Sequence, residues 1–136
     1  MTVMFPSPEW LKALEDKLNS DDRYAQIAKK WEGDILCQIE PDRFLKESLF
    51  YYLDLWHGTC RRTAILDAVP EEKPAFILLA PYANFAKILK GELDPMQAML
   101  TRKLQVQGNM ALMMRSVPTV LDFVRCAREV TTEILS

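Results

Sequence analysis

The stretch that decides the fold is NFAKILKGELDPMQAMLTRKLQVQGNMALMMR, residues 84–115. Apolar residues at three- and four-residue spacing predict a helix in its first part. Gly91 ends that helix, because a helix C-terminus favours a residue that tolerates a left-handed backbone. Asp94 then begins a second helix as its N-cap, with Pro95 in the first turn. The pattern therefore predicts two helices separated by a glycine stop.

The second half of this stretch predicts a strand and a further helix. Residues 103–107 alternate between polar and apolar side chains, which indicates a short half-buried strand. Gly108 ends the strand, and Asn109 caps the next helix. Five of the seven methionines fall within this stretch. Because methionine is unbranched and polarizable, the cluster indicates either the adaptable wall of an apolar compartment or a core in which methionines fill gaps.

The order of these elements resembles the closing motif of the sterol carrier protein type 2 family. The matching residues read Gly91-x-x-Asp94-Pro95-x-x-Ala98 and then Lys103-Leu104-x-Val106-x-Gly108-Asn109-x-Ala111. Trp31-x-Gly33 before a strand also agrees, and the resemblance covers about residues 24–126. It implies an α+β fold, in which a five-stranded mostly antiparallel sheet is covered on one face by helices, with an apolar tunnel between the layers. We expect one such domain over residues 1–136.

The resemblance implies that the protein binds and carries apolar lipids in this tunnel, such as fatty acids, fatty acyl-CoA, or sterol- or isoprenoid-like molecules. Such ligands bind by leaving water, at roughly 25 cal/mol per Å² of buried surface, so they need little specific chemistry. The candidate lining residues are apolar positions of the predicted strands and helices: Leu53, Leu55, Phe85, Ile88, Met96, Met99, Leu100, Leu104, Met110, Met113 and Leu121. Basic residues that either meet a lipid head group or are ordinary surface charges are Arg62, Arg102, Lys103 and Arg115.

The strongest strand signal lies at residues 48–57, which are rich in aromatic side chains. His57-Gly58 predicts a two-residue hairpin loop. This loop pairs Asp54 with Arg61 across the two strands and places Arg62 on the inner face. A buried guanidinium needs a partner, so Arg62 either meets the carboxylate or phosphate of a ligand or extends its head to water. A shift in register would also remove the conflict.

The other elements follow from similar signals. A helix is predicted after Ser7, and the run Asn19-Ser20-Asp21-Asp22 breaks it and caps a second helix. A strand opens at Gly33, and the apolar run over residues 75–80 predicts a strand that is buried on both faces. The helix that restarts at Val117 has an apolar face wider than the usual ~100° stripe. We therefore hypothesise that this C-terminal helix contacts either the ligand or a second subunit, as in a homodimer, in addition to the core.

Composition excludes several classes of protein. The chain of 136 residues carries a formal charge of −2 and has no basic stripe, so we expect no nucleic-acid partner and at most transient membrane contact. Its three cysteines form no metal-ligand cluster, and we expect no metal, no disulfide framework and no cofactor. The start MTVMFPSPEW has no signal-peptide pattern, and the end Ile134-Leu135-Ser136 is not a peroxisomal address. We expect a cytoplasmic location.

The sequence carries no recognisable catalytic motif. The single histidine, His57, falls on a predicted hairpin tip, and no nucleophile elbow or glycine-rich phosphate loop is present. We expect no catalytic residues and no enzymatic activity. Two hypotheses remain: a lipid carrier, or a non-catalytic accessory or partner-docking subunit of a lipid- or quinone-handling pathway. A carrier should copurify with lipid, whereas a docking subunit should be empty and should associate with a partner.

Overall fold

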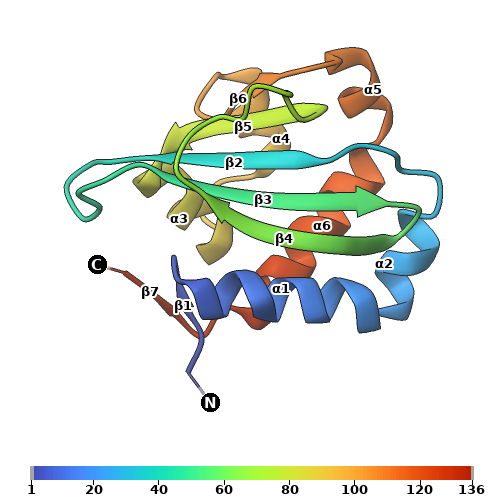
Figure 1. Ribbon diagram of the computed structural model, residues 1–136, viewed down its shortest axis with the longest axis horizontal. Coiled ribbons are helices and arrows are strands. Elements are labelled where there is room, and N and C mark those ends of the chain that lie inside the picture. Colours follow the sequence, from blue (N-terminus) through green and yellow to red (C-terminus); the bar gives the residue numbers. More distant parts are fainter. Residues whose placement is uncertain (1, 136) are drawn as a thin grey trace.

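The computed structural model describes residues 2–135 and contains a five-stranded sheet with the strand order β4-β3-β2-β5-β6 (Figure 1). Its strands are β2 (Ile35–Glu40), β3 (Leu49–Trp56), β4 (Thr59–Leu66), β5 (Phe76–Pro81) and β6 (Gln105–Gln107). All neighbouring strands are antiparallel except β2 and β5, which are parallel. The predicted α+β fold with a mostly antiparallel sheet is therefore confirmed.

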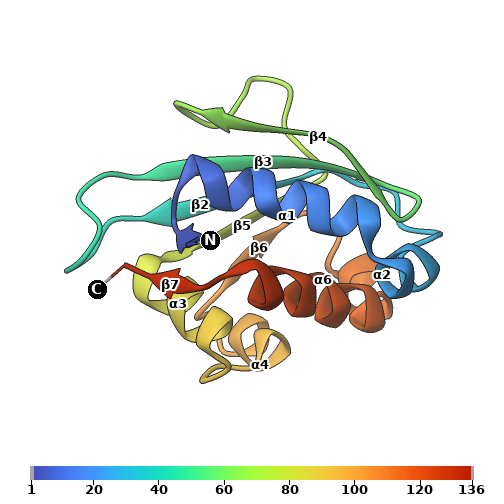
Figure 2. The ribbon, with the colours of Figure 1, turned by 90° about the horizontal axis from the view of Figure 1, so that it is seen from below.

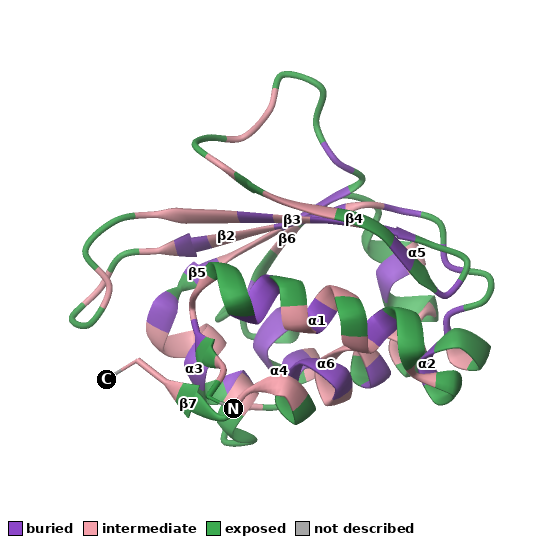
Figure 3. Ribbon diagram, turned by 60° about the horizontal axis from the view of Figure 1, so that its bottom comes forward, coloured by how far each residue is buried: buried purple, intermediate pink, exposed green. Residues whose placement is uncertain are grey.

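The helices form one layer against one face of this sheet (Figures 2 and 3). They are α1 (Pro8–Ser20), α2 (Asp22–Ile27), α3 (Tyr82–Lys90), α4 (Pro95–Leu100), α5 (Met110–Arg115) and α6 (Val117–Val130). The short strands β1 (Met4–Phe5) and β7 (Glu133–Ile134) pair in parallel and bring the two terminal segments together. No helix within residues 2–135 is both long and apolar enough to cross a membrane.

Helix α6 occupies the centre of the helical layer, where it contacts each of the five other helices. Contacts within the chain therefore explain most of its wide apolar face, whereas Leu121 remains 43% exposed. The helix ends at Val130, and Ile134 lies beyond it in β7. A homodimer through the C-terminal helix stays a prediction.

Local signals place the ends of the helices. The carboxylate of Asp94 accepts hydrogen bonds from the backbone amides of Met96 and Gln97, at 2.9 and 3.0 Å. Asn109 caps α5 in the same way, at 3.0 Å. Gly91 ends α3 with a φ angle of +79°, in the left-handed region that favours glycine. These predicted caps and the predicted stop are confirmed.

The hairpin between β3 and β4 forms at His57-Gly58, whose φ angles are +50° and +82°. Beside the turn the pairing follows the two-residue loop, with Leu55 opposite Cys60, but a β-bulge then shifts the register so that Asp54 lies opposite Arg62 and not opposite Arg61 as predicted. Arg61 still reaches Asp54, with hydrogen bonds of 3.1 and 3.0 Å. The prediction that Arg62 lies on the inner face is wrong, since an extra residue in one strand turns the following side chains to the opposite face. Its guanidinium lies 4.8 Å from the centre of the Tyr52 ring.

Candidate functional site

An apolar cavity of about 80 Å³ lies between the sheet and the helical layer. The sheet contributes Cys37, Ile39, Tyr51, Leu53 and Leu78 to its wall. The opposite side is built mainly by α1, α3 and α6, through Trp10, Leu14, Phe85, Ile88, Leu89, Val120, Phe123, Val124 and Ala127. Both layers of the fold therefore supply its surface.

A second cavity of about 40 Å³ lies beside the first, and its lining residues include Tyr24, Trp31 and Met113. The two cavities share four side chains, namely Leu78, Met99, Val120 and Phe123. Both volumes are below the roughly 300–1,000 Å³ that is typical of ligand pockets. A long ligand therefore requires the shared side chains to move, and the unbranched Met99 is the most adaptable of them.

The thiol of Cys37 belongs to the wall of the first cavity. Burial raises the pKa of this thiol to about 12. The thiol is therefore protonated at neutral pH and acts as a small apolar group, because only the thiolate is a strong nucleophile.

Most of the predicted lining residues border these cavities. Leu53, Phe85, Ile88, Met99 and Leu104 line the first cavity. Leu55 and Met113 line the second, together with Met99. Met96 packs against the core as a partly buried side chain, away from both cavity walls.

Three residues that were predicted to line the apolar cavity lie at the surface instead. Leu100 and Leu121 are 64% and 43% exposed, and Met110 is 37% exposed and borders a surface groove with Arg102. The reason is geometric: each residue of a helix is turned by about 100° from the one before. Leu100 therefore points away when its neighbour Met99 points inward, and Leu121 is related to Val120 in the same way.

The predicted head-group residues do not form one cluster. Arg62 lies on the outer face of the sheet, Arg102 borders the groove beside Met99, and Arg115 borders another groove beside Lys30. Lys103 is exposed. The contributions of Trp10 and Leu14 to the cavity were not predicted, because the sequence does not tell which side of the sheet α1 covers.

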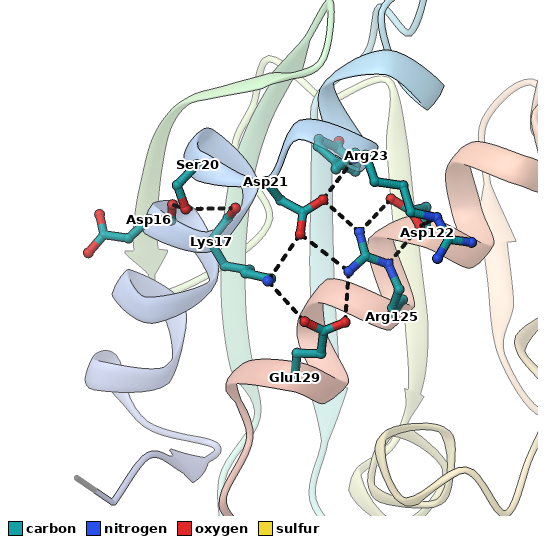
Figure 4. A network of polar contacts seen from close by, with 9 residues as sticks. Asp16, Lys17, Ser20, Asp21, Arg23, Asp122, Arg125 and Glu129 are labelled. Atoms are coloured by element: carbon teal, nitrogen blue, oxygen red, sulfur yellow. Dashed lines mark hydrogen bonds and ion pairs between the residues drawn. The ribbon is translucent and has the colours of Figure 1, made fainter.

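A network of charged side chains lies on another side of α6 (Figure 4). Asp122 is 3% exposed, and its carboxylate accepts hydrogen bonds from Arg125 at 2.8 and 3.0 Å. Arg125 also bonds to Asp21, the N-cap of α2, at 2.7 Å. Lys17 of α1 joins Asp21 to Glu129 of α6, at 3.0 and 2.9 Å. The network therefore ties α6 to both N-terminal helices.

The same network accounts for a group of potential metal ligands. Ligand atoms of Asp21, Asp122 and Cys126 lie within 4.8 Å of one another. The hydrogen bonds from Arg125 and the Tyr24 amide hold the pKa of the Asp21 carboxyl well below its usual range. Burial raises the pKa of the Cys126 thiol to about 11, so it is a poor ligand at neutral pH. The group suits an ion-pair network better than a metal ion.

The sheet, the single helical layer and the apolar cavities between them define the class as an α+β protein with an apolar interior between its two layers. The model of the SCP-2 sterol transfer family matches residues 11–120, so the chain belongs to this family. Lipid binding or transfer is the general role of the family.

Solved structures agree with this assignment. A crystal structure of sterol carrier protein 2 is 30% identical, with a TM-score of 0.82, over 92% of this chain and 98% of that chain. A conserved hypothetical protein from Thermus thermophilus is 29% identical, with a TM-score of 0.82, over 92% of this chain and 88% of that chain. Palmitated SCP2L2 from Aedes aegypti shares the fold at 14% identity and a TM-score of 0.57, over 85% and 94% of the two chains. No curated protein matches the sequence.

Proposed function

We propose that the protein binds one long-chain lipid, such as a fatty acid, a fatty acyl-CoA or an isoprenoid, in the space between the sheet and α6, and carries it through water. The observation that carries this proposal is the pair of adjoining apolar cavities, which are walled by both layers and share four side chains. A bound acyl chain is compatible with the fold, since one structure that shares it is of a palmitated protein.

The chemistry of the cavity favours affinity that depends on chain length. Each buried methylene contributes about 0.8 kcal/mol, which corresponds to roughly a fourfold gain in affinity. Apolar contacts have no preferred direction, so the walls accept chains of different shape. Such a site therefore discriminates among ligands mainly by the length and flexibility of their chains, and less by their detailed structure.

We further propose that the protein binds its ligand without catalysis. The strongest potential nucleophile in the cavity wall is the Cys37 thiol, which is protonated at neutral pH because its pKa is raised to about 12. His57 lies outside the cavity on the hairpin, where its Nε2 atom is 2.6 Å from the Glu32 carboxylate.

Native mass spectrometry of freshly purified protein, followed by organic extraction, tests the carrier function. We expect a bound mass that resolves into fatty acid, phospholipid or isoprenoid. An empty protein that also fails to bind a fluorescent fatty acid would contradict the proposal.

The second candidate is a partner-docking subunit, which includes the homodimer through the C-terminal helix. It is favoured by the exposed apolar side chains of Leu100 on α4 and Leu121 on α6. Sedimentation of the wild type and of Leu121→Glu separates the possibilities. Self-association that is lost in the variant supports the docking function, whereas a monomer at all concentrations contradicts the homodimer.

A further inference from the structure

A surface groove of about 400 Å³ opens beside the second cavity. It runs between the segment that joins α2 to β2 and the junction of α5 with α6. Two side chains, Trp31 and Thr119, line both this groove and the second cavity. The indole of Trp31 is held by a 2.8 Å hydrogen bond to the Gly33 carbonyl. The groove and the apolar interior therefore meet at a defined pair of side chains.

The groove is lined by two basic side chains that lie outside ion-pair distance of any carboxylate among residues 2–135. Lys30 and Arg115 both line it, and both are exposed. Neither takes part in an ion pair among residues 2–135, in contrast to Arg125, which pairs with three carboxylates. The one acidic residue of the groove, Glu32, is bonded to His57 at 2.6 Å. Two cations therefore face the groove without a partner.

We propose that this groove binds the anionic head group of the lipid, through Lys30 and Arg115. The inference rests on the proposed function and narrows its ligand to a single-chain amphiphile with a compact carboxylate or phosphate head. Guanidinium groups bind both kinds of oxyanion in a bidentate manner. The head stays partly hydrated in an open groove, so it avoids the large cost of burying a charge.

The two cavities then hold the acyl chain of the ligand. From the groove, the acyl chain passes Trp31 and Thr119 into the second cavity, and from there past Met99 and Phe123 into the first. The groove at α4 and β6 is a poorer match for the head group. It shares only Met99 with the cavities, and its single cation is Arg102.

The test compares a charged ligand with an uncharged one of the same length. The double variant Lys30→Glu/Arg115→Glu and the wild type are titrated with cis-parinaric acid and with its methyl ester, at pH 8 and low salt. We expect the variant to bind the acid at least tenfold more weakly and the ester equally well. Added salt should reduce the difference, because the groove is open to solvent. Lys29→Glu/Lys46→Glu changes the net charge equally at exposed positions outside the groove and should bind both probes like the wild type.

Each other result overturns a defined part of the account. An unchanged affinity for the acid places the head group elsewhere, and a loss in Arg102→Glu instead would place it at the α4 groove. An equal loss for acid and ester would show damage to the cavity, which thermal melting of the variant checks. Failure of the wild type to bind either probe would refute the proposed function itself. Displacement of the acid by a fatty acid or by a lysophosphatidate of equal length distinguishes a carboxylate head from a phosphate head.

Discussion

Two sides of α6 differ in chemistry and in packing. The side that faces the sheet places Val120, Phe123 and Ala127 around an apolar cavity that they do not fill. Another side carries Asp122 and Arg125 in a network of short hydrogen bonds to α1 and α2. Charged hydrogen bonds have a fixed geometry, whereas apolar contacts do not. The difference suggests that the network holds the helix in place so that the cavity side can remain loosely packed and yield to a ligand.

The largest expected effect comes from breaking the network at its buried member. Asp122→Ala removes a carboxylate that is 3% exposed and leaves Arg125 without one of its three carboxylate partners. Asp122 accepts two hydrogen bonds from Arg125, and each hydrogen bond to a charged group contributes about 1.5–3 kcal/mol, so we expect a loss of about 3 kcal/mol in the free energy of unfolding, measured by urea denaturation. Asp16→Ala breaks the exposed pair with Lys12 and serves as the control, with no measurable change expected. Equal effects in the two variants would refute the role of the network.

A smaller effect is expected from removing one charge of the network. Asp21→Asn keeps a good N-cap but loses the charge that bonds to Arg125 and Lys17, at a cost of about 1.5 kcal/mol at pH 7. The pKa of Asp21 is lowered in the folded state, so its contribution is complete above the unfolded value of about 3.9 and is lost as the pH falls through the lower folded value. The difference in stability between the wild type and the variant should therefore begin to shrink below about pH 4 and should vanish only as the pH falls through the lower pKa of the folded state. A difference that stays constant as the pH falls from neutral into this acidic range would contradict this assignment.

The smallest effect on stability is expected from a substitution on the outer face of the sheet, away from α6. Arg62→Ala removes the guanidinium that covers the Tyr52 ring, an exposed cation–π contact that is worth about 0.5–1 kcal/mol. Because the bulge turns Arg62 away from the cavity, fatty-acid affinity should not change. If fluorescence titration shows that Arg62→Ala binds the fatty acid tenfold more weakly than the wild type, Arg62 belongs to the ligand site after all.

The sequence predicted the features that depend on neighbouring residues. The caps at Asp94 and Asn109, the stop at Gly91 and the turn at His57-Gly58 each need only local geometry, and all are confirmed. The bulge after the turn was not predictable in the same way, because it depends on the balance between two registers of a whole strand pair.

The site was predictable only in part, because it is assembled from distant segments. Periodicity correctly brought Leu53, Ile88 and Met99 to the cavity, but it also overestimated the inner face of the helices by including Leu100 and Leu121. Lys30 was not among the predicted site residues, since nothing in its local sequence shows that it lies beside Arg115 in one groove. Such juxtapositions follow from long-range packing and need the structure.

One measurement tests most directly whether the cavity beside α6 is the lipid site. Ala127 is 3% exposed and lines the first cavity, so Ala127→Leu should fill it without breaking a polar contact. Filling a cavity commonly adds about 0.5–2 kcal/mol to stability. Titration with cis-parinaric acid should show at least a tenfold loss of affinity, with a melting temperature equal to or above that of the wild type. Ala111→Leu, at an exposed position of α5, should bind normally. Wild-type affinity in a stably folded Ala127→Leu protein would contradict the account.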